Sequence, residues 1–138
     1  TIILASRNEK IPIYGKGKSI RDWIFVDDHC DAIMDVLLNG KSGESYNISA
    51  GNEIDNITII KKILTIIGKP LENIEFVEDR PGHDFRYSME STKIRNTLGW
   101  SQKKKFEEGL KKTIDWYLEN KEWWMNLDQK ILDATPWK

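Results

Sequence analysis

The sequence is poor in the residues that build disulfides and metal sites. Cys30 is its only cysteine, and the 138 residues contain just two histidines. A single thiol excludes an intramolecular disulfide, and so few thiols and imidazoles make a zinc-type ligand set improbable. We therefore predict no metal site and, from the cysteine usage, a reducing, cytoplasmic location. Cys30 lies in a segment of helical hydrophobic spacing, which favours a small core residue over a reactive thiol.

An excess of one charge and long apolar runs are also missing. The chain has 21 Lys and Arg against 22 Asp and Glu, a net charge of −1. Such a balance produces no overall field to attract nucleic acid or an anionic membrane. No apolar run approaches the roughly 18 residues that span a bilayer. We expect neither nucleic acid nor membrane as a partner, so that any anion site must be local.

Nucleotide-binding glycine motifs are absent as well. No GxGxxG follows a strand and no P-loop is present, so no cofactor-binding residues are predicted. The glycines of GKGK, residues 15–18, precede no helix and favour a plain turn over a ligand loop. Tyr14 and Lys18 have the spacing of a Tyr-x-x-x-Lys pair, but a glycine turn does not hold two such side chains together as a helix does. We interpret that match as chance and predict no catalytic residue.

What is present indicates one globular domain. Hydrophobic residues make up 39% and charged residues 31%, and the six Trp can supply buried area. The first residues, TIILASRNEK, lack an initiator Met and a basic-then-apolar leader. This start resembles the inside of a longer protein rather than a signal peptide.

The hydrophobic pattern predicts short strands mixed with helices. Strands are expected over residues 11–14, 20–26, 45–49 and 74–77. Helices are expected from Asp27 or Asp28 to Asn39, over 57–67 after Asn56, from Met89 to Leu98, and over about 106–120. This order is typical of the α/β or mixed α+β class.

The most charged stretch is EDRPGHDFRY, residues 78–87. Its Pro81-Gly82 pair predicts a turn from which Arg80 and His83 project on two limbs. A guanidinium and the backbone N–H groups of a glycine turn suit a phosphate. The alternative is a solvated loop with Asp-Arg pairs that contribute less than about 1 kcal/mol each. The residues alone leave both interpretations open.

Several segments carry a family resemblance in order along the chain. They are PIYGKGKSIRDWIFVDDHCDAI, GESYNI, DNITII, EDRPGHDFRY, KIRNTLGW and GLKKTIDWYLEN. Together they closely resemble the C-terminal part of dTDP-glucose 4,6-dehydratases, which are NAD-dependent enzymes of the extended short-chain dehydrogenase/reductase superfamily. The match runs from about residue 1 to residue 124. The RDW and VDDH segments are shared widely among nucleotide-sugar enzymes, whereas DRPGHD followed by RY is narrower.

The resemblance implies two domains that bind different ligands. An N-terminal Rossmann domain holds NAD, and a smaller C-terminal domain holds the nucleotide of dTDP-glucose. Residues 1–124 are then a nucleotide-sugar-binding domain, and 125–138 are a Trp-containing tail of unknown role. The implied substrate-binding residues are Pro12, Ile13, Tyr14, Arg21, Asn56, Asp79, Arg80, Pro81, Gly82, His83 and, with a weaker match, Tyr87.

The residues themselves leave simpler roles for three of these positions. Tyr14 could be a half-buried strand aromatic rather than a base contact. Asn56 could cap a helix, a role compatible with ligand contact. Arg21 could pair on the surface with Asp22 or Asp27.

Three hypotheses for function follow. The first is the dTDP-sugar-binding portion of a dTDP-glucose 4,6-dehydratase, truncated or fragmentary, because the family's catalytic residues and NAD fingerprint belong to the N-terminal portion. The second is the substrate domain of a related UDP- or GDP-sugar epimerase or dehydratase. The third is a stand-alone, non-catalytic module with the Trp-rich tail as a docking surface. A domain that lacks its Rossmann partner is expected to expose an apolar face or to self-associate.

Overall fold

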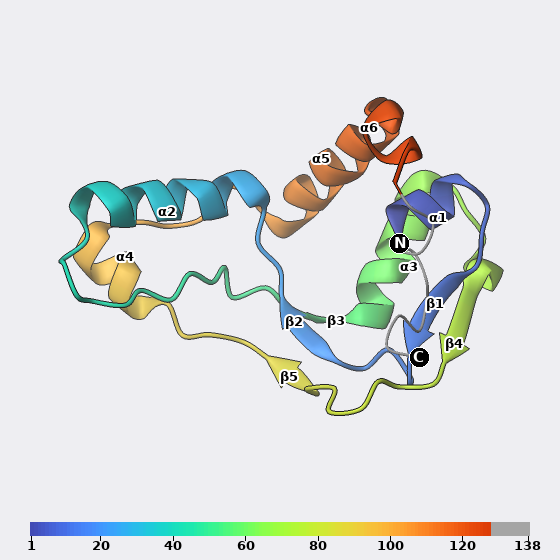
Figure 1. Ribbon diagram of the computed structural model, residues 1–138, viewed down its shortest axis with the longest axis horizontal. Coiled ribbons are helices and arrows are strands. Elements are labelled where there is room, and N and C mark those ends of the chain that lie inside the picture. Colours follow the sequence, from blue (N-terminus) through green and yellow to red (C-terminus); the bar gives the residue numbers. More distant parts are fainter. Residues whose placement is uncertain (128–138) are drawn as a thin grey trace.

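The computed structural model describes residues 1–127. The chain forms two lobes joined by a small central sheet, and the long axis runs from one lobe to the other (Figure 1). The larger lobe contains α1 (Ile2–Ser6), β1 (Ile11–Tyr14), α3 (Asn56–Ile67), β4 (Ile74–Val77), α5 (Phe106–Glu119) and α6 (Lys121–Met125), with a 3-10 turn at Leu71–Asn73. The smaller lobe contains α2 (Val26–Asn39) and α4 (Thr92–Leu98), and the sheet contains β2 (Ile20–Asp22), β3 (Glu53–Asp55) and β5 (Arg86–Tyr87). The predicted mixed α/β class is confirmed.

Helix α3 is the centre of the larger lobe. Ile57, Ile60 and Leu64 are buried against α1 and β1, while Ile59 and Ile63 are buried against Ile114 of α5. Because the helix is covered on two faces, it tolerates a β-branched composition of low helix propensity. Each fully buried Ile contributes about 1.5–3 kcal/mol of burial free energy. Packing therefore stabilises this helix more than local propensity does.

The ends of α3 follow local chemistry, with one correction. The Asp55 carboxylate accepts the N–H of Thr58 at 3.0 Å, so Asp55 is the N-cap. The predicted cap, Asn56, is the first residue of the helix. Gly68 ends the helix in the left-handed conformation, at φ 73°.

The strands lie in two separate sheets. In the larger lobe β1 pairs in parallel with β4, from Ile11 opposite Ile74 to Tyr14 opposite Val77. In the centre β2 pairs antiparallel with β3 and in parallel with β5. The predicted strand over 20–26 ends at Asp22, because β3 and β5 offer only short partners, and Phe25 already caps α2.

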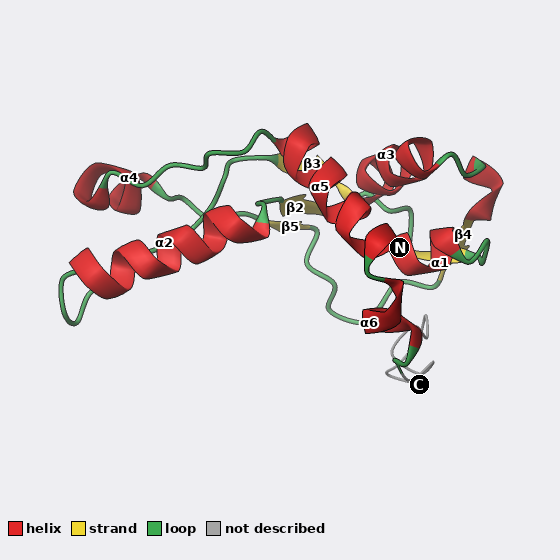
Figure 2. Ribbon diagram, turned by 90° about the horizontal axis from the view of Figure 1, so that it is seen from above, coloured by secondary structure: helices red, strands yellow, loops and turns green. Residues whose placement is uncertain are grey.

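The smaller lobe departs most from the sequence-based expectations. Ala32 and Val36 of α2 pack with Ile94 of α4, but Ile33 and Leu37, on the same predicted apolar stripe, are 49% and 73% exposed. Cys30 is exposed, so its predicted core position is wrong. The physical reason is that α4 is a short helix and covers only one side of α2, as the view from above shows (Figure 2).

Residues 45–49 are extended but form no strand, so this prediction is wrong. Tyr46 and Ile48 contribute side chains to the α2–α4 cluster, yet no described strand pairs with their backbone. The helix expected from Met89 begins only at Thr92, whose N–H is bonded by the Glu90 carboxylate.

The C-terminal part begins as expected. Ile114 of α5 is fully buried, and Phe106 and Leu110 of the same predicted stripe pack beside it. Asn120 separates α5 from α6, and Trp124 of α6 is 4% exposed. The predicted tail 125–138 lies outside the described residues from residue 128 onward. Within residues 1–127, no helix is both long and apolar enough to cross a membrane.

Candidate functional site

The candidate site forms where two loops run side by side. Residues 15–19 connect β1 to β2, and residues 78–85 connect β4 to β5. Because each strand pairs in parallel with its counterpart, both loops leave the larger lobe together and enter the central sheet together (Figure 1). Gly15 N donates to Val77 O at 2.9 Å at one end, and Ile20 N donates to Phe85 O at 2.7 Å at the other. The parallel pairing thus brings the GKGK turn to the EDRPGHDFRY loop.

Gly15 allows the two loops to touch. It has φ +56°, and a Cβ placed on it would lie 2.8 Å from Asp79 Oδ2. Both the backbone conformation and this close approach favour glycine. The GKGK segment is therefore a turn, as predicted, and it forms one wall of the site.

Asp79 and His83 are paired across the Pro81-Gly82 turn. His83 Nδ1 lies 2.6 Å from Asp79 Oδ1, and the His83 side chain is only 5% exposed. The ring of Tyr14 from β1 meets the imidazole edge-on, with the centroids 6.2 Å apart. The hydrogen bond from His83 is the main reason that the pKa of the Asp79 carboxyl lies below its usual value, and the bond from the Arg80 N–H lowers this pKa further. This half of the loop is ordered by side-chain contacts.

Arg80, Pro81 and Gly82 form the outer, exposed part of the loop. Gly82 has φ +67°, the positive value expected for the turn. The backbone N–H of Arg80 donates to Asp79 Oδ1, but its guanidinium has no hydrogen bond or salt bridge with any residue in 1–127. An exposed, unpaired guanidinium is available to an anion.

Arg21 lies beside this loop rather than in a surface ion pair. Its guanidinium donates to Ile20 O at 2.6 Å and to Asp84 O at 2.9 Å, so it ties β2 to a residue 63 positions away. Neither expected alternative partner is used. The Asp22 carboxylate instead accepts the N–H groups of Gly51 and Asn52 and the hydroxyl of Ser49.

The remaining predicted residues lie around the same two loops, with one difference. Asn56 N donates to Ser19 O at 3.1 Å, which places the start of α3 against the GKGK turn. Tyr87 is 57% exposed on β5 and stands opposite Arg21 in the register. Pro12 is half-buried, whereas Ile13 is 3% exposed and belongs to the core. Only the backbone of Ile13 is left for its predicted ligand contact.

Sequence reasoning missed the ion pair that secures β5. Arg86 donates from Nε and Nη2 to the two carboxylate oxygens of Glu53, at 2.7 and 2.6 Å, and Ser88 donates to Oε1. The hydrogen bond from Arg86, with a smaller contribution from that of Ser88, lowers the pKa of Glu53 to about 2. The partners are 33 positions apart on short strands, so no sequence pattern connected them.

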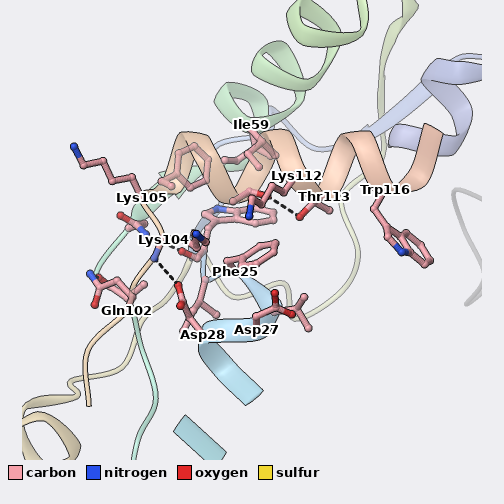
Figure 3. Close-up of a pocket in the computed structure, with 18 of the residues that line it drawn as sticks. Phe25, Asp27, Asp28, Ile59, Gln102, Lys104, Lys105, Lys112, Thr113 and Trp116 are labelled. Atoms are coloured by element: carbon pink, nitrogen blue, oxygen red, sulfur yellow. Dashed lines mark hydrogen bonds between the residues drawn. The ribbon is translucent and has the colours of Figure 1, made fainter. Parts of the chain in front are cut away.

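A separate hollow lies elsewhere in the described residues. A cavity of about 740 Å³ opens between α5, the start of α2 and Ala50, and its wall includes Trp23, Phe106 and Trp116 (Figure 3). None of the predicted substrate-binding residues lines it. The buried carboxylate of Asp28, at its rim, is occupied by the backbone N–H groups of Lys103 and Lys104. This hollow is therefore distinct from the two-loop site.

Comparison with known proteins gives consistent results. The dTDP-glucose 4,6-dehydratase of Escherichia coli is 43% identical over 145 residues, which cover 97% of this chain and 39% of that protein. The solved dTDP-glucose 4,6-dehydratase of Bacillus anthracis, in complex with NAD, superposes with a TM-score of 0.87 at 43% identity, covering 92% of this chain and 40% of that one. The Streptomyces venezuelae enzyme, solved with NAD and a thymidine nucleotide, gives 0.89 at 37% identity, covering 92% and 39%.

The chain thus spans about 39% of the length of the curated relatives it matches. The resemblance to dTDP-glucose 4,6-dehydratases, noted from the sequence, is confirmed. The family profile described as GDP-mannose 4,6 dehydratase matches residues 1–113, most of the chain. The chain therefore belongs to the GDP-mannose 4,6 dehydratase family.

Proposed function

We propose that this chain is the nucleotide-sugar-binding portion of a dTDP-glucose 4,6-dehydratase and binds the nucleotide diphosphate at the two-loop site. The observation that carries the proposal is that β1 and β2 both contact the EDRPGHDFRY loop, because Tyr14 meets the His83 ring and Arg21 donates to Asp84 O. Solved relatives with this fold have NAD and a thymidine nucleotide bound. The similarity in sequence and fold supports the same ligand class here.

Different residues of the site are suited to different parts of the nucleotide. Arg80 supplies an exposed guanidinium, which binds phosphate oxygens through two parallel hydrogen bonds. Arg21, bonded to Asp84 O, and His83, bonded to Asp79, contribute further nitrogen groups to the same loop. The ring of Tyr14 offers a flat apolar surface of the kind on which a base stacks. Charge-assisted bonds of this type contribute about 1.5–3 kcal/mol each.

The described residues do not fit NAD. The glycines nearest the site, Gly15 and Gly17, both have positive φ, but their turn leads from one strand into another. A dinucleotide fingerprint needs a glycine turn that opens a helix, whose N-terminus then receives the pyrophosphate. We therefore derive no hydride-transfer step from this chain, and we place NAD and the catalytic residues in a further part of the enzyme.

We propose that this further part packs against the smaller lobe. The side of α2 that faces away from α4 carries Val26, Ile33, Met34, Leu37 and Leu38, all between 49% and 73% exposed. The neighbouring segment 45–49 is extended with no strand beside it in the described residues. A bare helix face next to an unpaired extended segment is the arrangement left when a sheet is removed from a layered α/β protein.

The intact mass of the native gene product tests this partner. A mass well above that of 138 residues supports a longer enzyme with a Rossmann portion. A native product of this length alone would overturn the whole-enzyme proposal. For the isolated chain, self-association through the α2 face stays a prediction, which sedimentation velocity of the wild type and of Leu37→Lys measures.

Nucleotide titration tests the function itself. Calorimetry of the native-length protein with dTDP, UDP and GDP is expected to rank dTDP as the tightest ligand. Equal affinity for the three would contradict the dTDP assignment, and no binding would contradict a nucleotide site. The cytoplasmic location predicted from cysteine usage stays a prediction.

A further inference from the structure

The Asp79–His83 pair fixes which ring nitrogen carries a proton. An ionised carboxylate only accepts hydrogen bonds, so His83 Nδ1, 2.6 Å from Asp79 Oδ1, must be the donor. The lowered pKa of Asp79 keeps that carboxylate ionised at neutral pH. In a neutral imidazole, the second nitrogen, Nε2, is then a bare acceptor.

Nε2 has no hydrogen-bonding partner among residues 1–127. A phosphate oxygen is also an acceptor. The lone pair on Nε2 of a neutral ring would therefore face a lone pair of the phosphate, and no hydrogen bond could form. Only the imidazolium can donate from both nitrogens, to Asp79 on one side and to an anion on the other. The tautomer that Asp79 selects is therefore unsuited to a diphosphate until the ring gains a proton.

The groups packed around the ring are Asp79, Tyr14 and the backbone of Arg80. Asp79 accepts from Nδ1, the Arg80 N–H donates to the same carboxylate oxygen, and Tyr14 meets the ring edge-on from β1. The side chain of His83 is only 5% exposed, so few water molecules can reach it. A diphosphate bound here adds a second set of acceptor oxygens beside a ring that already faces the Asp79 carboxylate.

We propose that Asp79 is a positioning residue that makes His83 bind the nucleotide diphosphate as an imidazolium, so that ligand binding takes up a proton. This inference rests on the proposed function, because it needs the diphosphate at the two-loop site. Its consequence is a pH-dependent affinity, with binding weakening by about tenfold per pH unit where the free ring is neutral and the bound ring is charged. The arginines contribute no such dependence, because they remain charged.

The measurement is calorimetry in pairs of buffers that differ in ionisation enthalpy, between about pH 6 and 9. The terminal phosphate of dTDP itself takes up a second proton near pH 6, so the probe is the β-methyl ester of dTDP, which lacks that titration. For the wild type we expect proton uptake on binding.

Three variants separate a positioning role from a structural one. His83→Gln keeps an N–H donor close to the place of Nε2 but cannot gain a proton, so binding should persist with no uptake. Asp79→Asn keeps the shape of the side chain but supplies an amide N–H that can donate to Nδ1, so the neutral ring can carry its proton on Nε2, and proton uptake on binding should be smaller than in the wild type. Asp84→Asn changes the neighbouring carboxyl of the same loop, which has no hydrogen bond or ion pair with His83, and should leave the uptake unchanged.

The outcomes are distinct. Binding of the ester without proton uptake at every pH, or proton uptake in Asp79→Asn as large as in the wild type, would overturn this inference and leave the proposed function standing. Absence of binding would overturn the proposed function and this inference with it.

Discussion

Removing the Arg80 side chain is the sharpest test of the two-loop site. The guanidinium has no hydrogen bond or salt bridge with any residue in 1–127, so Arg80→Ala deletes no side-chain hydrogen bond within that part of the chain. If the guanidinium binds the diphosphate, the variant loses one charge-assisted contact, about 1.5–3 kcal/mol. The dissociation constant for dTDP should then rise about 10- to 150-fold. The melting temperature should stay that of the wild type.

Arg21 supplies a matched contrast. Its guanidinium bonds Ile20 O and Asp84 O, so Arg21→Ala should weaken dTDP binding and also lower the melting temperature. Arg80→Lys should fall between wild type and Arg80→Ala, because an ammonium keeps the charge but not the planar pair of donors. The assays are calorimetric titration with dTDP and thermal unfolding of each variant under the same conditions.

Two results would refute the reasoning. An unchanged dissociation constant for Arg80→Ala would show that no phosphate reaches this side chain, and the outer loop would be a solvated turn. A large drop in the melting temperature of Arg80→Ala would show that the guanidinium supports the fold.

Three further perturbations test the packing that positions the site. Ile94→Ala, in the fully buried contact between α2 and α4, should cost about 2–5 kcal/mol of unfolding free energy, measured by urea titration. Glu53 has its pKa lowered to about 2 by Arg86, so the pair stabilises the fold above the ordinary Glu value and this stabilisation is lost as the pH falls toward 2. The melting-temperature gap between wild type and Glu53→Gln should therefore be widest near neutral pH and close in acid. Gly15→Ala should weaken dTDP binding, because its Cβ would meet Asp79 Oδ2 at 2.8 Å.

Ile94→Ala and Gly15→Ala each have a control in the chain. Ile66→Ala truncates an Ile that is 44% exposed and should cost far less than Ile94→Ala. Gly43→Ala also places alanine at positive φ, +79°, but no atom lies within 4 Å of its Cβ, so dTDP affinity should not change. The packing described would be contradicted if Ile66→Ala cost as much unfolding free energy as Ile94→Ala, or if Gly43→Ala weakened dTDP binding as much as Gly15→Ala. A melting-temperature difference between wild type and Glu53→Gln that is the same at all pH values would contradict it as well.

Helices α2 to α5 and the longest strands were predictable because their signals are local, whereas the five-residue helices α1 and α6 were not predicted. The i, i+3, i+7 spacing of Ile57, Ile60 and Leu64 marks a buried helical face wherever the helix packs. The strands at 11–14 and 74–77 were found with their observed bounds. The helix that carries Cys30 was found too, but the exposure of Cys30 depends on what covers α2, and α4 covers only one side.

Pairing over long distances in the sequence was not predictable. β3 and β5 are three and two residues long, too short for any periodicity, and exist because β2 lies between them. Residues 45–49 have the composition of a strand but lack a pairing partner among residues 1–127. Backbone hydrogen bonding between distant segments decides both cases.

For the site, the sequence by itself determined the chemical groups: a Pro-Gly turn with a guanidinium, a carboxylate and an imidazole, and a family resemblance that implies a nucleotide target. Only the tertiary structure decided their partners. It paired His83 with Asp79, set Tyr14 against the imidazole, bound Arg21 to the backbone of Asp84 and left the guanidinium of Arg80 without a hydrogen bond or salt bridge among residues 1–127. The physical reason is that residue types fix which bonds are possible, whereas the parallel pairing of β1 with β4 and of β2 with β5 fixes which groups come within reach.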